Sequence, residues 1–176
     1  MKLWTFQHTK VAEHLEYNNI YYADPKHVDD NWLIAYRWMS ERMQERNINI
    51  QNSTPIWLWA YQPTFSILYD LLSEHEFSQG ICLIEVDVPG EQAIFSCYDQ
   101  WNTFLYFCLE HKKIPIIDNK YRKMFTSFHD LTHNGIQVTL PYLKREWVSQ
   151  VKDLTHYIRS NDWCENNSLI SFETNV

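Results

Sequence analysis

Hydrophobic and polar side chains alternate one by one near the start of the chain, in LWTFQH at residues 3–8. Successive side chains of a β-strand point to opposite faces, so this period of two predicts a strand. The alternation recurs in PIWLWAYQP at residues 55–63, where aliphatic side chains fall on one face and Trp57, Trp59 and Tyr61 on the other. A second strand, aromatic on one face, is therefore predicted there.

Four other segments carry apolar residues at intervals of three and four, which is the spacing of one helical face. Each starts at a residue that favours a helix N-terminus: Thr9, Asp29 or Asp30, Asp99, and Pro141. The first ends at Asn18 and Asn19, which can supply a left-handed stop in place of glycine. The last is predicted to bury one face made of Leu143, Trp147, Val151, Leu154 and Ile158.

Short apolar runs predict three more strands, over residues 81–88, 93–98 and 136–140. The first two are joined at Pro89-Gly90, a strong turn motif. Residues 114–134 show no clear period, and part of that segment is assigned as helix.

The length of 176 residues fits one domain. We expect an α+β fold over residues 1–160, a small mixed or antiparallel sheet flanked by helices, followed by a polar tail over residues 161–176. The chain has 15 basic and 22 acidic residues, a net charge of −7, and no basic block. Because phosphate backbones are held by clustered lysine and arginine, bulk nucleic acid is not an expected partner.

The four cysteines form no C-x-x-C pair and no regular ladder of spacings, so neither a zinc knuckle nor a disulfide framework is indicated. No apolar run reaches the length of a signal peptide or of a segment that crosses a bilayer. We expect a cytoplasmic protein without a membrane partner.

The common catalytic motifs are missing from the sequence. The three glycines are not closely spaced, which excludes G-x-G-x-x-G and the P-loop. G-x-S-x-G, H-E-x-x-H and the zinc deaminase pattern are also absent. His129 and His133 stand four apart with Asp130 between them, but two histidines without a third ligand are common by chance, so no metal site is predicted. Glu85 and Asp87 share one face of a strand, and we favour an exposed face over a paired-carboxylate site.

The face made by Trp57, Trp59 and Tyr61 has two interpretations. Large rings dominate core burial, so this face suits core beneath a helix. We favour the core interpretation; the alternative is a stacking wall for nicotinamide, adenine or another flat ring.

Five separated blocks resemble a bacterial family, domain of unknown function 3841, in the same order from residue 1 to about 155. They are MKLWTFQ, AYRWMSERMQER, PIWLWAY, EVDVPGEQAIFSCYDQWNTFL and IQVTLPYLKREWVSQV. The family has no established activity, so this resemblance implies a class without a reaction. Asn18-Asn19 stands where a glycine is expected after the first helix.

A more distant similarity is to ADP-ribosyltransferase-like folds, which open with a strand bearing a polar NAD-contacting residue and later present a glutamate on a strand that leads into a helix. LWTFQ with VAEHLEYNN resembles the opening, and IQVTLPYLKREWV resembles the closing part. Gln137 stands where this resemblance requires the glutamate. A glutamine keeps the hydrogen bonds but loses the charge that opposes the cation-like sugar. The resemblance therefore implies an NAD-binding or nucleotide-binding protein with weak or absent transferase activity.

The pocket residues implied are Gln7, Tyr36, Arg37, Trp59, Tyr61 and Gln137. Gln7 would hold the amide or ribose, Arg37 the pyrophosphate, and Trp59 or Tyr61 would stack on a ring. Gln137, the candidate catalytic position, would contact the ribose in a cleft shared with Gln7. Arg37 equally suits a solvated helix face.

The alternative is a protein-binding module without catalysis, for example in a bacterial conflict or phage-related system. Interfaces favour tryptophan and tyrosine at their centres. A flat exposed surface made by Trp57, Trp59 and Tyr61 would favour the module. A concave pocket beside Gln7 and Gln137 would favour the nucleotide.

Overall fold

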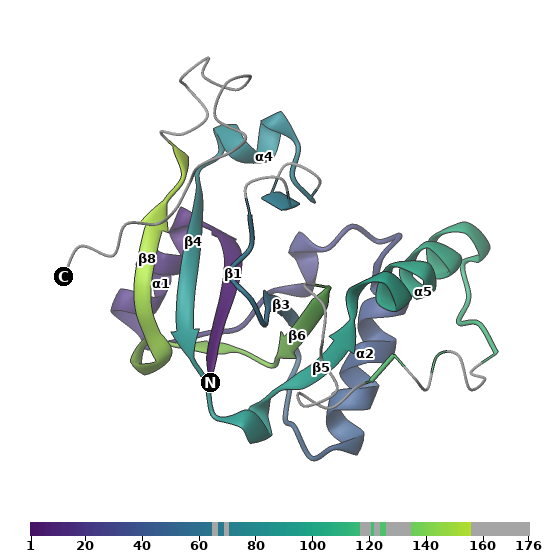
Figure 1. Ribbon diagram of the computed structural model, residues 1–176. Coiled ribbons are helices and arrows are strands. Elements are labelled where there is room, and N and C mark those ends of the chain that lie inside the picture. The colour runs from purple at the N-terminus through teal and green to yellow at the C-terminus, as the bar shows by residue number, and fades with distance from the viewer. Residues whose placement is uncertain (65–66, 69–70, 117–120, 122–123, 126–134, 156–176) are drawn as a thin grey trace.

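The computed structural model describes residues 1–64, 67–68, 71–116, 121, 124–125 and 135–155. Six strands form one antiparallel sheet in the order β5-β6-β3-β1-β4-β8 (Figure 1). They are β1 Lys2–His8, β3 Ile56–Trp59, β4 Ile81–Asp87, β5 Ile94–Cys97, β6 Ile136–Leu140 and β8 Val148–Asp153. Two short strands, β2 (Ile20–Tyr21) and β7 (Leu143–Lys144), pair separately.

Helices pack on both faces of the sheet. They are α1 Thr9–Asn18, α2 Leu33–Glu45, α4 Glu74–Ser78 and α5 Tyr98–His111. Single 3-10 turns lie at Pro25–His27, Gly90–Gln92 and Arg145–Trp147. The predicted α+β class and single domain are confirmed, and so are the five strands predicted from alternation and short apolar runs.

One face of the sheet is aliphatic and lies against α1. Leu3, Leu58 and Val138 come from three neighbouring strands and pack with Val11 and Leu15 of the helix. Each strand alternates, so its other residues turn to the opposite face. The alternation in the sequence therefore identified this face correctly.

The opposite face is covered in two parts. Helices α2 and α5, on the right of Figure 1, cover the β3, β6 and β5 end with an aromatic cluster that includes Trp38, Trp101 and Phe104. Helix α4, at the top of Figure 1, contributes Phe77 to a second cluster over β4, which includes Leu83. Aromatic side chains thus concentrate on the face away from α1.

The strands that the Pro89-Gly90 turn joins do not pair with each other. β4 lies between β1 and β8, whereas β5 forms the far edge of the sheet beside β6. The 3-10 turn at Gly90–Gln92 therefore starts a crossing between distant strands and closes no hairpin. A turn motif indicates a change of direction but not which strand comes next in space.

Helix starts differ from the prediction by one to three residues. His8 caps α1, because its ring nitrogen accepts a hydrogen bond from the Lys10 N–H at 3.1 Å. Cys97 precedes α5 without a side-chain cap, so Asp99 lies in the first turn. The α1 stop is as predicted: Asn19 has φ 62° and donates its N–H to Leu15 O.

The predicted helix after Pro141 is wrong. Its residues form β7, the Arg145–Trp147 turn and β8. Leu143, Trp147 and Leu154 are buried as predicted, but Val151 is 46 % exposed on an edge strand. The spacing of Leu143, Trp147 and Leu154 matches a helical face only by coincidence. The segment forms a strand because it pairs with β4, and this tertiary contact overrides the local helical pattern.

Four predictions fall wholly or mostly outside the described residues: the His129 and His133 pair, the helix within residues 114–134, the burial of Ile158, and the tail over residues 161–176. None of the helices in the described ranges is long and apolar enough to cross a bilayer. Over the same ranges, no three histidine, cysteine, aspartate or glutamate side chains gather as metal ligands would.

Candidate functional site

Side chains that lie directly opposite one another on neighbouring strands form a row across the face away from α1. Trp59 of β3 lies opposite Trp4 of β1 on one side and Gln137 of β6 on the other. Gln137 in turn lies opposite Ser96 of β5. At the other end, Trp4 lies opposite Glu85 of β4. Opposed residues have Cβ atoms about 4.5–5.5 Å apart, so these five residues, here called the Gln137 row, are successive neighbours.

Two polar groups in the middle of this face are buried without partners. Gln137 is only 7 % exposed and Ser96 0 %. Neither Gln137 Oε1 nor Ser96 Oγ has a hydrogen-bond partner among the described residues, and the same holds for Gln100 Oε1 in the first turn of α5. A buried polar atom left unpaired costs about 1–3 kcal/mol. The two row residues lie side by side, so their presence needs an explanation other than stability.

Aromatic rings wall the same place. The Tyr98 and Trp59 ring centroids are 5.0 Å apart. α5 follows β5 directly, and its Tyr98 N–H donates to Gly135 O at 2.7 Å, which holds the helix start against the strand that carries Gln137. The unpaired Gln137 Oε1 thus belongs to a residue that neighbours Trp59, whose ring contacts Tyr98.

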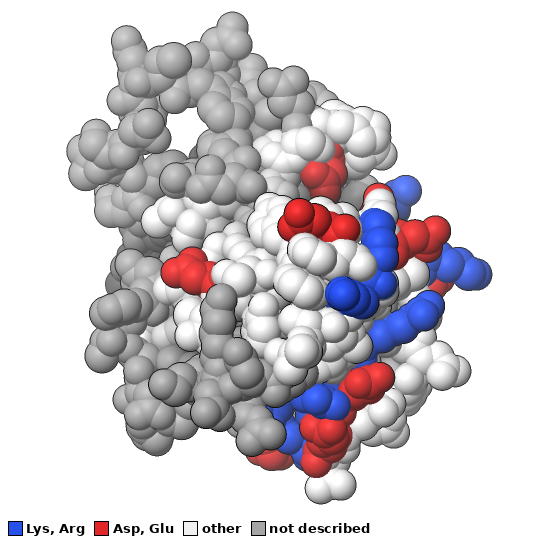
Figure 2. Space-filling view, turned by 90° about the vertical axis from the view of Figure 1, so that its right-hand side faces the viewer, with Lys and Arg blue, Asp and Glu red and all other residues white. Residues whose placement is uncertain are grey.

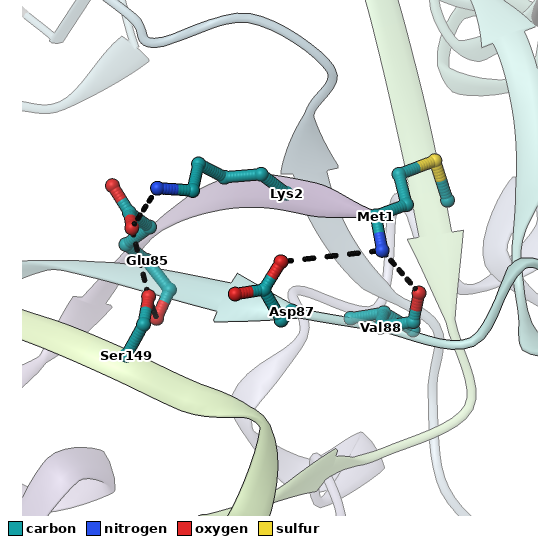
Figure 3. A network of polar contacts seen from close by, with 6 residues as sticks. All are labelled: Met1, Lys2, Glu85, Asp87, Val88 and Ser149. Carbon is teal, nitrogen blue, oxygen red and sulfur yellow. Dashed lines mark hydrogen bonds and ion pairs between the residues drawn. The ribbon is translucent and has the colours of Figure 1, made fainter.

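The carboxylate at the end of the row is fully engaged. Glu85 accepts hydrogen bonds from Lys2 Nζ at 2.9 Å and Ser149 Oγ at 2.8 Å (Figure 3), and from Trp4 Nε1 at 3.2 Å. Burial by itself would raise the Glu85 pKa, but these hydrogen bonds outweigh it and lower the pKa below its usual value. The Glu85 carboxylate is thus held ionised in a structural role.

Glu85 and Asp87 differ although they share a strand face. The Glu85 side chain is 17 % exposed, so the predicted exposed face is wrong for this residue. The Asp87 side chain is 60 % exposed, as predicted. Figure 3 shows why the strand is well held here: the Met1 amine donates to Val88 O at 2.9 Å and lies 4.0 Å from Asp87 Oδ1.

Gln7 does not share a cleft with Gln137, contrary to the prediction. Gln7 points to the same face of β1 as Leu3 and lies opposite Cys82 of β4. Leu3 and Cys82 both belong to the cluster under α1. Its amide donates to Thr5 Oγ1 at 2.8 Å, and that hydroxyl donates to Trp57 O at 2.7 Å. Gln7 is therefore a paired residue on the opposite face of the sheet.

The other predicted pocket residues have separate environments. Tyr36 packs with its ring centroid 5.7 Å from that of Trp57, and burial raises its pKa, an effect that Trp57 only partly opposes. Arg37 is exposed on α2, as its alternative interpretation predicts. Tyr61 is 41 % exposed just beyond β3. Of the six, only Trp59 and Gln137 are brought together in the row.

The aromatic face of β3 forms no exposed patch. Trp57 packs on Trp101 with ring centroids 4.5 Å apart, and Trp59 is 6 % exposed. Trp57 is partly buried, and Tyr61 is 41 % exposed. The protein-binding alternative loses the surface from which it was argued and stays an untested prediction.

Sequence reasoning missed Ser96, Tyr98 and Gln100. The alternation of residues 93–98 does put Ser96 on the same side as buried Ile94, and a serine on an apolar strand face is a usable clue. Nothing in the sequence places these residues beside Gln137, because that depends on the order of strands.

Charge does not gather over this side of the molecule. Figure 2 shows acidic and basic side chains intermingled along one margin of the face that carries α5. The part of this face that the structure describes thus has no single-sign patch that would hold a polyanion.

Comparison with known proteins identifies a family but no activity. The model of a family described as Domain of unknown function (DUF3841) matches residues 2–146, so the chain belongs to that family. No curated protein matches the chain, and no solved structure matches it.

Proposed function

We propose that this member of the DUF3841 family binds a nucleotide of the NAD class at the Gln137 row and has weak or no transferase activity. The observation that carries the proposal is the pair of buried, unpaired polar atoms, Gln137 Oε1 and Ser96 Oγ, beside the Trp59 ring. Unpaired groups of this kind are tolerated where a ligand completes them.

The chemistry of the row matches a flat ring with an amide or amino group. The unpaired Gln137 Oε1 accepts a hydrogen bond, which matches the N6 amino group of adenine and equally the amide N–H of nicotinamide. Stacking of a base on an aromatic side chain is worth about 1–3 kcal/mol. Trp59 and Tyr98 provide the rings, while Gln137 and Ser96 provide the polar contacts.

The row lacks a carboxylate for fast transfer of ADP-ribose. Transfer develops positive charge on the sugar, and loss of one preorganised electrostatic group costs on the order of 100-fold in rate. Gln137 is neutral, and it stands where the resemblance to ADP-ribosyltransferase-like folds requires a glutamate. Glu85, the carboxylate of the row, is already bound by Lys2, Ser149 and Trp4.

Thermal-shift titration with NAD, ADP-ribose, adenosine and nicotinamide tests the binding. A ligand at 100 times its Kd adds about 2.7 kcal/mol to the free energy of unfolding, so wild type should show a clear rise in Tm with NAD. Gln137→Ala should weaken binding by roughly 0.5–1.5 kcal/mol. Gln7→Ala, on the other face, is the matched control and should leave the NAD shift unchanged. No shift in wild type at millimolar NAD would contradict the proposal.

Activity is tested separately. Gln137→Glu places a carboxylate at the neutral position, so slow NAD hydrolysis should rise above that of wild type when nicotinamide release is measured. If both proteins bind NAD but hydrolyse it at equal rates, the Gln137 row binds the nucleotide without supporting transfer.

A further inference from the structure

The loop after α2 carries amide side chains on one side and buried side chains on the other. In residues 47–51, NINIQ, the isoleucines Ile48 and Ile50 are 4 % and 1 % exposed. Asn47, Asn49 and Gln51 alternate with them and are exposed. The loop is therefore anchored at two points and presents three carboxamides outward in a row.

The end of α2 fixes the first of these amides. Asn47 has φ 60° and donates its N–H to Gln44 O at 2.9 Å, while the Ile48 N–H donates to Met43 O at 3.0 Å. This pair of bonds is a Schellman stop, and the buried contact of Ile48 with Met43 completes it. The positive φ of Asn47 is thus explained by the helix end.

Gln51 takes its positive φ in a β-turn over residues 50–53, which is closed by the Ser53 N–H donating to Ile50 O at 3.2 Å. Its φ is 53°, a region that disfavours side chains with a Cβ and is uncommon for glutamine. The residue is held there by its N–H bond to Asn49 Oδ1 and by its amide, which donates to the Tyr22 hydroxyl, both at 3.0 Å. These bonds hold the Gln51 amide beside Tyr22, and both residues line one groove.

The groove itself measures about 290 Å³ and is lined by these amides, Gln92 and two tyrosines. Tyr22 meets Tyr142 edge to face with ring centroids 5.4 Å apart, and the Tyr142 hydroxyl donates to Gln92 Oε1 at 3.4 Å. The bonds leave Gln51 Oε1 as a free acceptor and the Gln92 amide N–H groups as free donors, as judged over the described chain. The groove thus presents donors and acceptors beside aromatic rings.

The groove has little charge to offer an anion. Lys144 is the cation that lines it, and its Nζ already pairs with Glu146 Oε1 at 3.1 Å. A phosphate or carboxylate ligand would need a free guanidinium or ammonium group. The ligand that fits is neutral and rich in hydroxyl groups.

We propose that the groove between the NINIQ loop, Tyr22, Gln92 and Tyr142 binds a neutral sugar ring. Hydroxyl groups both donate and accept, so they match carboxamides, which do the same. The apolar C–H face of a sugar packs on an aromatic ring. The volume lies at the lower limit for small-molecule sites and suits a single ring better than a dinucleotide. The groove shares no residue with the Gln137 row. Sugar binding in the groove is therefore independent of nucleotide binding at the row.

Saturation-transfer NMR on the full chain tests the proposal with glucose, galactose, N-acetylglucosamine and ribose as probes and inorganic phosphate as a competitor. Transfer to at least one neutral sugar is expected, without competition by phosphate. Competition by phosphate, or no transfer to any sugar, would overturn the proposal.

Two groove variants and one control locate the site. Gln92→Met and Gln51→Gly should each weaken sugar binding roughly three- to tenfold, the loss expected for one or two hydrogen bonds. Gln62→Ala removes an exposed amide elsewhere and should leave binding unchanged. Sugar binding that both groove variants retain would overturn the proposal.

Gln51→Gly has a second readout. Glycine adopts positive φ freely, so this variant should keep or raise the Tm while it loses sugar affinity. A lower Tm with retained affinity would show that Gln51 is structural and would contradict the assignment.

Discussion

The two faces of the sheet differ in whether their buried polar side chains are hydrogen-bonded. On the α1 face, Thr5 and Gln7 lie among aliphatic side chains and are hydrogen-bonded to each other. On the opposite face, Gln137 and Ser96 lie beside aromatic rings, and their side-chain oxygens are buried without partners in the described chain. Both faces are well packed, so packing does not account for the difference.

The comparison separates stability from function. A polar group that is paired within a core adds specificity at little cost, whereas an unpaired one destabilises the folded protein. Local conflicts of this kind tend to occur at functional sites. The α1 face is therefore interpreted as the structural face, and the face with the Gln137 row is the one where we propose that a ligand binds.

The largest expected effect is on the structural face. Leu58 is 0 % exposed within the α1-side cluster, so Leu58→Ala should lower the free energy of unfolding by about 2–5 kcal/mol, measured by urea denaturation. Tyr17→Ala on α1, where the side chain is 83 % exposed, is the control and should have little effect. A loss below about 1 kcal/mol at Leu58 would show that this face carries less of the stability than we infer.

The next largest expected loss of stability is at the hydrogen-bonded carboxylate of Glu85. Glu85→Gln should cost about 1.5–3 kcal/mol at neutral pH, because charge-assisted hydrogen bonds are lost. The folded-state pKa of Glu85 is lowered, so its contribution is complete above the unfolded value of about 4.3 and disappears as pH falls through the folded value. Unfolding curves of the two proteins should therefore converge in acid. Asp87→Asn, at an exposed site, should show a much smaller difference, and a gap at Glu85 that persists at low pH would contradict the role of its charge.

A smaller loss is expected at the paired amide of the structural face. Gln7→Met removes the bond to Thr5 Oγ1 and should cost about 0.5–1.5 kcal/mol, measured by thermal unfolding. The NAD-induced rise in Tm should stay as in wild type. A lost NAD response would mean that the two faces are not functionally distinct.

The fold was largely predictable because its strands alternate cleanly. The aliphatic face of residues 56–60 and the buried side of β4 follow from a period of two. The last predicted helix failed because edge-strand pairing with β4 is a long-range contact that local spacing does not contain.

The arrangement of the candidate residues was predictable only in part. Trp59 and Gln137 are neighbours across β3 and β6, but Gln7 lies on the other face of the sheet. A period of two shows which residues share a face within one strand, and it does not show which face that is relative to another strand. Ser96 and Tyr98 joined the site only once the strand order brought β5 beside β6. The burial of Ile48 and Ile50 in the NINIQ loop depends on packing that includes Ile94 of β5, a long-range contact that the local sequence does not show.

Gln137→Met, measured without and with NAD, tests the central claim most directly. Methionine has nearly the same size and no polar group to leave unpaired, so the free variant should be more stable than wild type by about 1 kcal/mol. Its NAD-induced rise in Tm should be lost or strongly reduced. If Gln137→Met is instead destabilised as Gln7→Met is, and NAD response is unchanged, then Gln137 is an ordinary core amide and the row is not a ligand site.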